Sequence, residues 1–363
     1  MKTCVLLLDE NRGFGGAERH VLSLARELEG RGLLASVVAR KDSWLFKEGS
    51  RSLPFSPCGF RNEVDMFSVF SIYKMVKSTG ANVLHCIAHR DLVAAALARQ
   101  LPGAPKLVLL KAEHSFPDND LSPLFRWAYR QCDGIASVSQ AMQTALQEKL
   151  RSETPWECRF EVVPNGIETP TGATAAPTPS SDGRLRVGIL SALHPGKGQR
   201  DVLEALAGAD PGLRERVHLS IAGDGPLKAE LQSLSQQLGL AVEFHGHHSD
   251  PVSFLGSLDL CLLPSHTETF SLVALESLTL GVPLLAADSQ GVSEIYTERE
   301  MIYPKGDRQA LLTKLEAFMA QPEVFRAAAT ELSARYRAQY SRESMGTNYQ
   351  RLYETLLTQQ AVS

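Results

Sequence analysis

The sequence predicts an α/β protein of two Rossmann-like domains, each built on a doubly wound parallel sheet. The chain has 363 residues, about twice the usual length of one compact domain. Short apolar runs alternate with segments long enough for crossover helices, which is typical of parallel sheets. This alternation stops at residues 169–183 and then starts again. We therefore expect one domain on each side of that stretch, with the two domains facing a central cleft.

The first half opens with a strand, a glycine-rich turn and a helix. The apolar run at residues 4–8 is followed by glycines within residues 13–16, and apolar residues then recur on one helical face from Ala17 to about Arg31. Gly30 and Gly32 are expected to end this helix. Further strands are expected at residues 35–38, 83–86, 106–110 and 134–138.

Residues 169–183 predict an interdomain linker. They hold no large apolar side chain and are rich in Pro, Thr, Ala and Ser. Beyond them, strands are expected at residues 185–190, 217–222, 241–244, 258–263 and 283–287, and helices near 198–208, 227–238, 271–280 and 308–320. The tail from 322 to 360 has a helical pattern. The expected domains are 1–168 and 184–340, and a last helix at 341–363 is expected to pack back towards the first domain.

Composition excludes several classes of protein. The hydrophobic fraction is 44% and the charged fraction 21%, as in folded globular proteins. The net charge of −4 argues against nucleic-acid binding, which needs clustered Lys and Arg. Residues 1–165 hold 21 Lys and Arg against 18 Asp and Glu, a slight excess that hints at an anionic acceptor or membrane. The six cysteines form no C-x-x-C pair, and the run at 4–8 is too short for a signal peptide, so we expect a cytoplasmic protein.

Three motifs follow predicted strands, where ligands of open α/β sheets bind. The first is the glycine turn, in which the backbone N–H groups of Gly15 and Gly16 can approach an anion such as a diphosphate. A tight connection without a ligand is an equally good interpretation. The second is residues 191–198, where Lys197 can pair with phosphate oxygens near a helix start. Taken alone, Lys197 is better interpreted as a solvated surface lysine.

The third motif runs from Pro264 to Glu276. Glu268 precedes an apolar helix, and Glu276 lies within it among leucine and valine residues. A carboxylate in such surroundings needs a polar partner. The hydroxyls of a ribose or a sugar are suitable, because a carboxylate accepts two hydrogen bonds from a diol.

The order of these motifs resembles family 4 of the retaining glycosyltransferases, which have the GT-B fold. Glu268 and Glu276 form the E-x7-E pattern of that family, followed by Gly-Val-Pro and a strand. The resemblance spans nearly the whole chain. Its matching segments are residues 15–18, 114, 138–139, 163–167, 197–198, 222–226, 268–276, 281–283 and 291–294.

The resemblance implies a role for each matching residue. Glu268 would hold the hydroxyls of the donor sugar, and Glu276 the ribose diol of the nucleotide. Lys197 would neutralise the diphosphate, and His114 would lie beside the transferred sugar. His114, Lys197 and Glu268 are thus the expected catalytic residues. The expected donor-binding residues are Gly15, Gly16, Lys197, Gly223, Phe270, Ser271, Leu272 and Glu276.

The resemblance also implies the reaction. A hexose or N-acetylhexosamine would pass from a nucleotide diphosphate sugar, with UDP favoured over GDP, to a glycan, a lipid-linked acceptor or a lipopolysaccharide. The first domain would bind the acceptor and the second the nucleotide sugar. No metal and no separate cofactor are expected. A peripheral contact with the cytoplasmic face of the inner membrane is a further expectation.

Two departures from the family pattern concern the donor site. Family members usually carry Arg beside the diphosphate, where this chain has Ala192. They also carry E-G-F-G, where this chain has E-T-F-S at residues 268–271. One charge-assisted hydrogen bond fewer would cost about 1.5 to 3 kcal/mol. Arg200 and His194 are the candidates to replace the missing cation.

Other features favour simpler interpretations. Residues 118–120 mimic a D-x-D metal motif but read as a solvated turn, and His245, His247 and His248 read as loop residues rather than metal ligands. The amphipathic stretch 66–77 is expected to be a crossover helix, with a membrane-surface helix as the alternative. The competing functions are a nucleotide-sugar epimerase and a catalytically silent nucleotide-sugar-binding protein.

Overall fold

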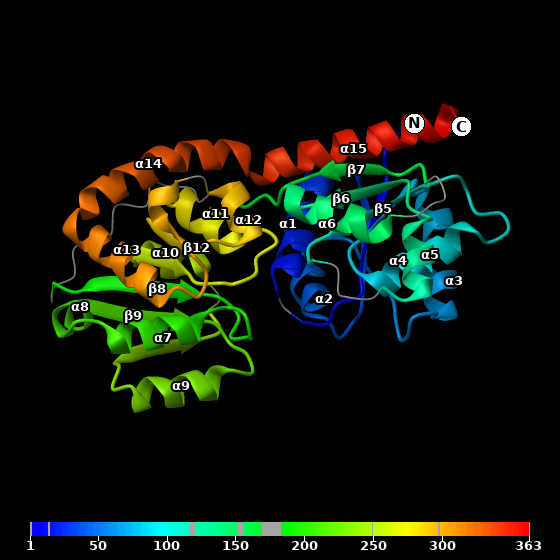
Figure 1. Cartoon of the computed structure of the whole chain (residues 1–363). Helices are drawn as coiled ribbons and strands as arrows, with labels where there is room; N and C mark the ends of the chain where they lie inside the picture. Colours follow the sequence, from blue (N-terminus) through cyan, green and yellow to red (C-terminus); the bar gives the residue numbers. More distant parts are fainter. Residues whose placement is uncertain are drawn as a thin grey trace. The chain divides into compact units, whose positions relative to one another are not determined.

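The computed structural model describes residues 2–13, 15–116, 121–151, 156–168, 183–248, 250–296 and 298–362. The chain forms two compact units (Figure 1). The first unit comprises Met1–Glu168 together with Tyr340–Ser363, and the second comprises Thr169–Gln339. The predicted linker lies outside the described residues except for Gly183.

The first unit contains a seven-stranded sheet, and every pair of neighbouring strands in it is parallel. In spatial order its strands are β3 (Phe55–Pro57), β2 (Leu34–Ala39), β1 (Val5–Asp9), β4 (Val83–Cys86), β5 (Val108–Glu113), β6 (Gly134–Ser137) and β7 (Arg159–Val162). Leu7 of β1 pairs with Val37 on one side and with His85 on the other. The strand order reverses its direction between β1 and β4, which is the switch point of a doubly wound sheet.

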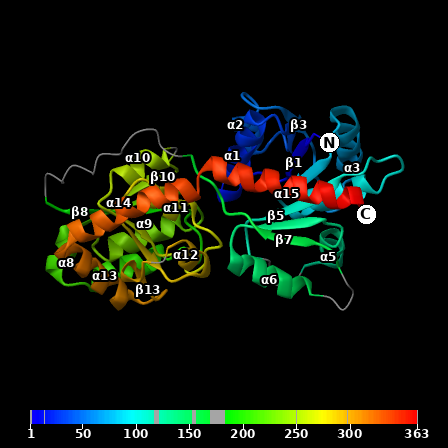
Figure 2. The same ribbon diagram turned by 90° about the horizontal axis from the view of Figure 1, so that it is seen from above.

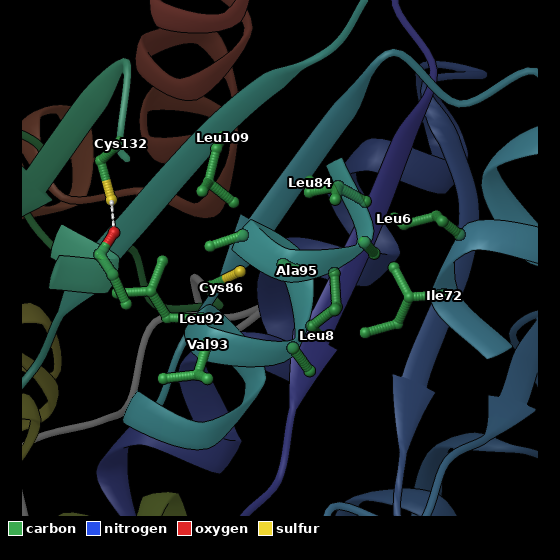
Figure 3. Packing of buried hydrophobic residues seen from close by; sticks show 14 of the residues in the cluster. Leu6, Leu8, Ile72, Leu84, Cys86, Leu92, Val93, Ala95, Leu109 and Cys132 are labelled. Carbon is green, nitrogen blue, oxygen red and sulfur yellow. Dashed lines mark hydrogen bonds between the residues drawn. The ribbon is translucent and has the colours of Figure 1, made fainter. Parts of the chain in front are cut away.

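Helices cover both faces of this sheet. They are α1 (Gly16–Gly30), α2 (Trp44–Gly49), α3 (Met66–Thr79), α4 (His89–Arg99), α5 (Pro123–Tyr129), α6 (Gln140–Leu150) and α15 (Arg342–Val362). Figure 3 shows the core between β1, β4 and β5 and the helices of one face, with Leu8, Cys86 and Leu92 among its side chains. The opposite face packs against α1 and α15 through a second cluster that includes Leu24, Leu110 and Leu356.

The final helix belongs to the first unit. In Figures 1 and 2, α15 runs along the sheet of this unit. Arg31, the C-cap residue of α1, donates to Gln350 Oε1 at 3.1 Å and to Thr347 Oγ1 at 3.0 Å. Near the end of the helix, Gln360 Nε2 donates to the carbonyl of Leu107 at 2.7 Å. The helix is therefore fixed to this unit at both ends.

The second unit repeats the plan with six parallel strands. In spatial order they are β10 (Val242–Gly246), β9 (Val217–Ala222), β8 (Leu185–Leu190), β11 (Leu260–Leu263), β12 (Leu284–Ala287) and β13 (Ile302–Tyr303). Its helices are α7 (Gln199–Gly208), α8 (Pro211–Arg216), α9 (Lys228–Gln237), α10 (Pro251–Gly256), α11 (Leu272–Thr279), α12 (Gln290–Ile295), α13 (Arg308–Ala320) and α14 (Pro322–Gln339), with a 3-10 turn at Arg299–Met301. Helix α7 packs against α9 and α13, whereas α11 packs against α10 and α14.

The predicted fold class is confirmed, because both sheets are parallel and helices cover them. Three short strands were not predicted: β3, β7 and β13. They hold two to four residues each, and β3 contains Pro57, which cannot donate to a sheet ladder. The strand expected at 106–110 starts later, at Val108, and continues to Glu113, which places His114 directly after β5. The tail forms two helices that are separated at residues 340–341, and the second begins at Arg342, next to the expected start at residue 341.

Candidate active site

The switch point of the second sheet brings together two predicted residues. The chain leaves β8 towards β9 on one side, and β11 lies on the other side, so the loops at their carboxyl ends diverge. Lys197 follows β8, and Glu268 follows β11. Lys197 Nζ lies 2.7 Å from Glu268 Oε1, with the side chains 28% and 12% exposed. A cation and a carboxylate therefore meet where the fold favours ligand binding.

The loop that carries Lys197, residues 191–198, has a shape that only glycine permits at its end. Gly198 has a φ of +73°, and a Cβ added there would lie 2.0 Å from the carbonyl oxygen of Pro264. The next residue, Gln199, is buried, and its Nε2 donates to the carbonyl of Ala192 at 3.0 Å and to Ser191 Oγ at 2.8 Å. Lys197 thus lies on a loop that is anchored from within.

The loop that carries Glu268 is fixed on both sides. The backbone N–H of His266 donates to the carbonyl of Gly196 at 2.9 Å, and His266 Nε2 lies 2.6 Å from Asp201 Oδ2. On the far side, the backbone N–H of Gly291 donates to the carbonyl of Glu268 at 2.9 Å. These bonds fix the loop against both α7 and α12.

Helix α11 begins directly after this loop. Ser271 is its N-cap, and Ser271 Oγ accepts a hydrogen bond from the backbone N–H of Ala274 at 3.2 Å. Phe270 and Ser271 are buried, and Leu272 is partly buried. The first N–H groups of a helix carry partial positive charge, which favours an anion near this end.

Glu276 is buried in the middle of α11. Burial raises the pKa of the Cys261 thiol in β11 to about 12, and the nearby Glu276 carboxylate contributes to this rise. Glu276 therefore lies close to β11, the strand whose carboxyl end carries the loop of Glu268. Its burial agrees with the sequence argument that this carboxylate needs a polar partner.

Gly223 joins a third loop to the same site. It has a φ of +145°, and an added Cβ would lie 1.9 Å from the carbonyl oxygen of Ser191. Its backbone N–H donates to the carbonyl of Gly246 at 2.7 Å. The loop after β9 therefore packs directly on the loop that carries Lys197, and no side chain fits between them.

The two candidate replacements for the missing arginine differ in their surroundings. Ala192 and His194 are both exposed. Arg200, in the first turn of α7, pairs with Glu230 of α9 and lies 3.3 Å from Glu204. To contact a diphosphate, Arg200 would have to exchange these two carboxylates for the ligand.

In the first unit, the predicted glycine turn meets a carboxylate of its own chain. Gly15 is the N-cap of α1, and Glu18 in the first turn is buried. Burial raises the pKa of Glu18, while hydrogen bonds from Asn11 and from the backbone N–H of Gly15 oppose the rise. A Cβ added at Gly15 would lie 3.1 Å from Glu18 Oε2. Glu18 thus caps the helix at the position considered for a diphosphate.

His114 lies in a group of buried aromatic and imidazole rings. Its ring centroid is 4.3 Å from that of His20 in α1, and His20 lies 5.9 Å from Tyr349 of α15. Burial, together with the charges of His20 and Lys111, lowers the pKa of His114 well below the usual value. Burial lowers the pKa of His20 to about 3. Both imidazoles are therefore neutral at physiological pH.

Two further polar groups of the first unit are almost fully buried, the Lys111–Glu113 ion pair and Asp9. Lys111 Nζ lies 2.7 Å from Glu113 Oε1 and donates to the carbonyls of Ile87 and Ala112 at 2.8 and 2.6 Å. Asp9 ends β1, and burial raises its pKa to about 7 against a hydrogen bond from the backbone N–H of Asn11. Both groups lie next to the switch point between β1 and β4.

The predicted residues thus divide between two sites. Lys197, Gly223, Glu268, Phe270 and Ser271 lie on neighbouring loops of the second unit. Leu272 begins α11, and Glu276 lies in the middle of that helix. Gly15, Gly16 and His114 lie in the first unit. The sequence reasoning missed His20, Asp9 and Lys111. Asp9 and His20 flank the glycine turn, a signal that was available in the sequence.

The structure describes the three neighbouring histidines, His245, His247 and His248, but not the D-x-D motif. Residues 118–120 lie outside the described residues. His245 lies in β10 rather than in a loop, and its ring and that of His248 pack against Phe254. Within the described part of the chain, no three His, Cys, Asp or Glu side chains are grouped as metal ligands would be. No helix in that part is both long and apolar enough to span a bilayer.

Two family models match the chain in succession. Residues 14–170 match Glycosyltransferase Family 4, and residues 174–338 match Glycosyl transferases group 1. Together they cover most of the chain, and their boundary falls within the predicted linker.

Curated relatives match parts of the chain. It is 33% identical to a glycogen synthase of Mycobacterium tuberculosis over 181 residues, which cover 46% of this chain and 40% of that protein. It is 35% identical over 126 residues to a GDP-mannose-dependent α-(1-6)-phosphatidylinositol dimannoside mannosyltransferase of the same species, covering 34% and 32% of the two chains. The chain thus matches less than half the length of these relatives.

Solved structures match it along almost its full length. Anabaena HepE, in complex with UDP and glucose, is similar with a TM-score of 0.78 and 22% identity, covering 98% of this chain and 99% of that one. The lipopolysaccharide outer core galactosyltransferase WaaB is similar with a TM-score of 0.71 and 17% identity, covering 96% and 98%. At these identities the likeness shows the fold.

Proposed function

Because the chain belongs to the family 4 type of glycosyltransferases with the GT-B fold, we propose that it transfers a sugar from a nucleotide diphosphate donor to a hydroxyl group, with retention of anomeric configuration. The transferred unit is a hexose or an N-acetylhexosamine. The proposed nucleotide is UDP, with GDP as the alternative. The complex of HepE with UDP and glucose supports UDP, and the GDP-mannose-dependent relative supports GDP as the alternative.

One observation carries the proposal: the Lys197–Glu268 pair at the switch point of the second sheet. A lysine on a loop after β8 suits the diphosphate, and a carboxylate on the loop after β11 suits sugar hydroxyls. In the structure, Lys197 and Glu268 are each other's charged partner. A bound donor would separate them, because its diphosphate and its sugar offer each group a partner of its own.

The other predicted residues complete the donor site in this proposal. The buried Glu276 accepts hydrogen bonds from the ribose diol, and the N–H groups at the start of α11, at residues 270–272, face the diphosphate. Gly223 keeps the neighbouring loop free of a side chain. In the first unit, His114 bonds to a hydroxyl of the transferred sugar, and its neutral ring suits an uncharged partner. Gly15 and Gly16 remain proposed donor contacts, although Glu18 already accepts a hydrogen bond from the backbone N–H of Gly15.

The proposed chemistry needs little from the protein except position and charge. The acceptor oxygen bonds to the anomeric carbon on the face that the diphosphate leaves, and the bond from that carbon to the phosphate oxygen breaks. The departing phosphate oxygen takes the proton of the acceptor hydroxyl. Lys197 stabilises the negative charge that develops on it. This route requires neither a metal nor an enzyme nucleophile.

The proposed acceptor is a glycan, a lipid-linked glycan or a lipopolysaccharide. A matched relative acts on a phosphatidylinositol dimannoside, and WaaB acts on a lipopolysaccharide outer core. In keeping with these acceptors, we place the protein in the cytoplasm, in peripheral contact with the membrane.

The experiment is a turnover assay with a panel of UDP-sugars and GDP-sugars, each with and without candidate acceptors. Release of nucleotide diphosphate that rises when an acceptor is added supports a transferase. Formation of an epimer without release would support an epimerase instead, and binding without turnover would support a silent binding protein. The last two results would each overturn the proposal.

A further inference from the structure

The exposed hydrophobic side chains of this protein gather at the start of α3. Six large hydrophobic side chains are exposed among the described residues, and four of them lie between residues 64 and 70. Phe67 is 76% exposed and Phe70 49% exposed, with Val64 and Met66 beside them. Exposed apolar groups that cluster in this way mark a surface that contacts something else.

The inner face of α3 explains why these residues point outwards. Val69, Ile72 and Val76 are buried in the core of the first unit. Phe67, Phe70 and Lys74 are spaced by three and four residues, so they share the opposite face of the helix. Asp65 caps the helix by accepting from the backbone N–H of Phe67 at 3.2 Å, which fixes the first turn. The exposed phenylalanines are therefore held on a well-formed helix rather than on a loose end.

Basic side chains surround the apolar group. The guanidinium of Arg61 lies over the ring of Phe67, 5.6 Å from its centroid. Lys74 and Lys77 continue the exposed face towards the end of the helix, and Lys77 Nζ lies 5.3 Å from the centroid of Tyr73. One acidic side chain, Glu63, is exposed in residues 61–77. The surface thus combines aromatic groups with a positive balance.

We propose that the outer face of α3, formed by Val64, Met66, Phe67, Phe70, Lys74 and Lys77 with Arg61, docks the protein on an anionic lipid bilayer. The phenylalanine rings insert at the level of the acyl chains, while the basic groups contact lipid phosphates. Charge decides between this partner and a second copy of the chain. A two-fold interface on this face would bring the basic groups of one copy towards those of the other.

The inference rests on the membrane contact named in the proposed function and assigns that contact to α3 and the residues just before it. Vesicle binding is measured without turnover, so its failure and a failure of the transferase activity are distinguishable. If it is correct, α3 lies in the plane of the membrane surface and the first unit is held there by its own helix. Binding should then need both kinds of side chain. Each basic residue near an anionic surface is expected to change affinity about fivefold, and loss of the two rings at least tenfold.

The test is co-sedimentation of the full chain with vesicles of phosphatidylcholine, alone or mixed equally with phosphatidylglycerol. The wild-type protein should bind the mixed vesicles and bind them less at high salt. The double variant Phe67→Ser, Phe70→Ser should lose at least tenfold in affinity, and Lys74→Gln, Lys77→Gln should lose affinity and much of the salt dependence. Val324→Ser is the matched control, because Val324 is 59% exposed on α14 of the second unit. Its binding should equal that of the wild type.

Two results would overturn the inference. The first is a failure of the wild-type protein to bind the mixed vesicles, or equal binding by the wild type and the phenylalanine double variant. The other is concentration-dependent self-association that the same double variant abolishes, which would assign the face to a second copy. Thermal unfolding of each variant checks that these exposed substitutions leave the fold intact.

Discussion

The strand ends of the two units share a topology but differ in their electrostatics. In the second unit, Lys197 and Glu268 are charged and partly exposed, and they neutralise one another across 2.7 Å. In the first unit, His20 and His114 are driven to the neutral form by burial, and Asp9 has a pKa raised to about 7. A charged ligand such as a diphosphate suits the charged side chains of the second unit, whereas uncharged hydroxyl groups suit the neutral imidazoles of the first unit. The contrast indicates that side chains at the strand ends, rather than the sheets themselves, would decide which ligand each unit binds.

The largest expected effect comes from removing the cation of the second unit. Lys197→Ala should lower kcat/KM at least a hundredfold, about 3 kcal/mol, because it removes the positive charge that would stabilise the leaving diphosphate and leaves Glu268 without its partner. Initial rates with saturating acceptor measure this. Lys305→Ala, at an exposed loop position of the same unit, is the matched control for loss of one positive charge. An equal fall of kcat/KM in both variants would show that the effect does not depend on the position of Lys197, which would contradict the contrast between the units.

A substitution at Gly198 should affect the second unit alone. Gly198→Ala places a Cβ against the carbonyl of Pro264 at a positive φ, so we expect a loss of about 2 to 4 kcal/mol in the local stability of the loops around Lys197. Hydrogen exchange should speed up in the loops after β8 and β11 and stay unchanged in the first unit. Gly208→Ala is the control, because nothing lies within 4 Å of the added Cβ. Unchanged exchange in Gly198→Ala would show that these loops are not locked together.

The outcome at these loops shows where sequence reasoning works and where it ends. The positions of both residues at strand ends, together with the resemblance to family 4, predicted that Lys197 and Glu268 serve one site. The sequence could not predict that they pair with one another, nor that Gln199 and His266 fix their loops. Those contacts join residues up to 71 positions apart, and they depend on how two loops pack in space.

The first unit shows a different limit. Asp9 and Lys111 lie in apolar strands and His20 lies among the apolar residues of α1, so a pattern of hydrophobicity treats all three as interruptions. Asp9 and His20 are buried because α1 and α15 cover one face of the sheet. Lys111 alternates with Leu110 and Ala112 in β5, so it is buried on the opposite face. Helix α15 comes from the far end of the chain, so no local pattern near Asp9 or His20 reports it.

A smaller effect is expected from Asp9, and it depends on pH. Its folded-state pKa is raised, so its ionised form costs stability that grows from about pH 4 to pH 7 and is complete above that. Asp9→Asn should therefore stabilise the first unit by about 1 to 3 kcal/mol at pH 8, with the gain vanishing near pH 4. All three tryptophans, Trp44, Trp127 and Trp156, lie in this unit, so their fluorescence follows its unfolding in urea. A gain that is equal at both pH values would contradict the assigned burial of a charge.

The smallest effect should be a gain in binding. Glu268→Gln removes the carboxylate that holds Lys197 and that repels a diphosphate, so the affinity for UDP without a sugar should rise about fivefold, near 1 kcal/mol. Turnover of the sugar donor should fall in the same variant, because the hydroxyls of the donor sugar lose the carboxylate that accepts their hydrogen bonds. Opposite changes in nucleotide affinity and turnover would sharpen the contrast between the units. A parallel fall in both would show that Glu268 does not compete for Lys197.

Calorimetric titration of the intact chain with UDP and with GDP tests the central claim, that the second unit grips the nucleotide. The wild-type protein should bind one of them, and Glu276→Gln and Lys197→Ala should each weaken that binding about tenfold or more, through the ribose and the diphosphate respectively. Asp9→Asn, in the first unit, should bind as the wild type does. Affinities that remain equal in Glu276→Gln, Lys197→Ala and the wild type, or a wild type that binds neither nucleotide, would contradict the account.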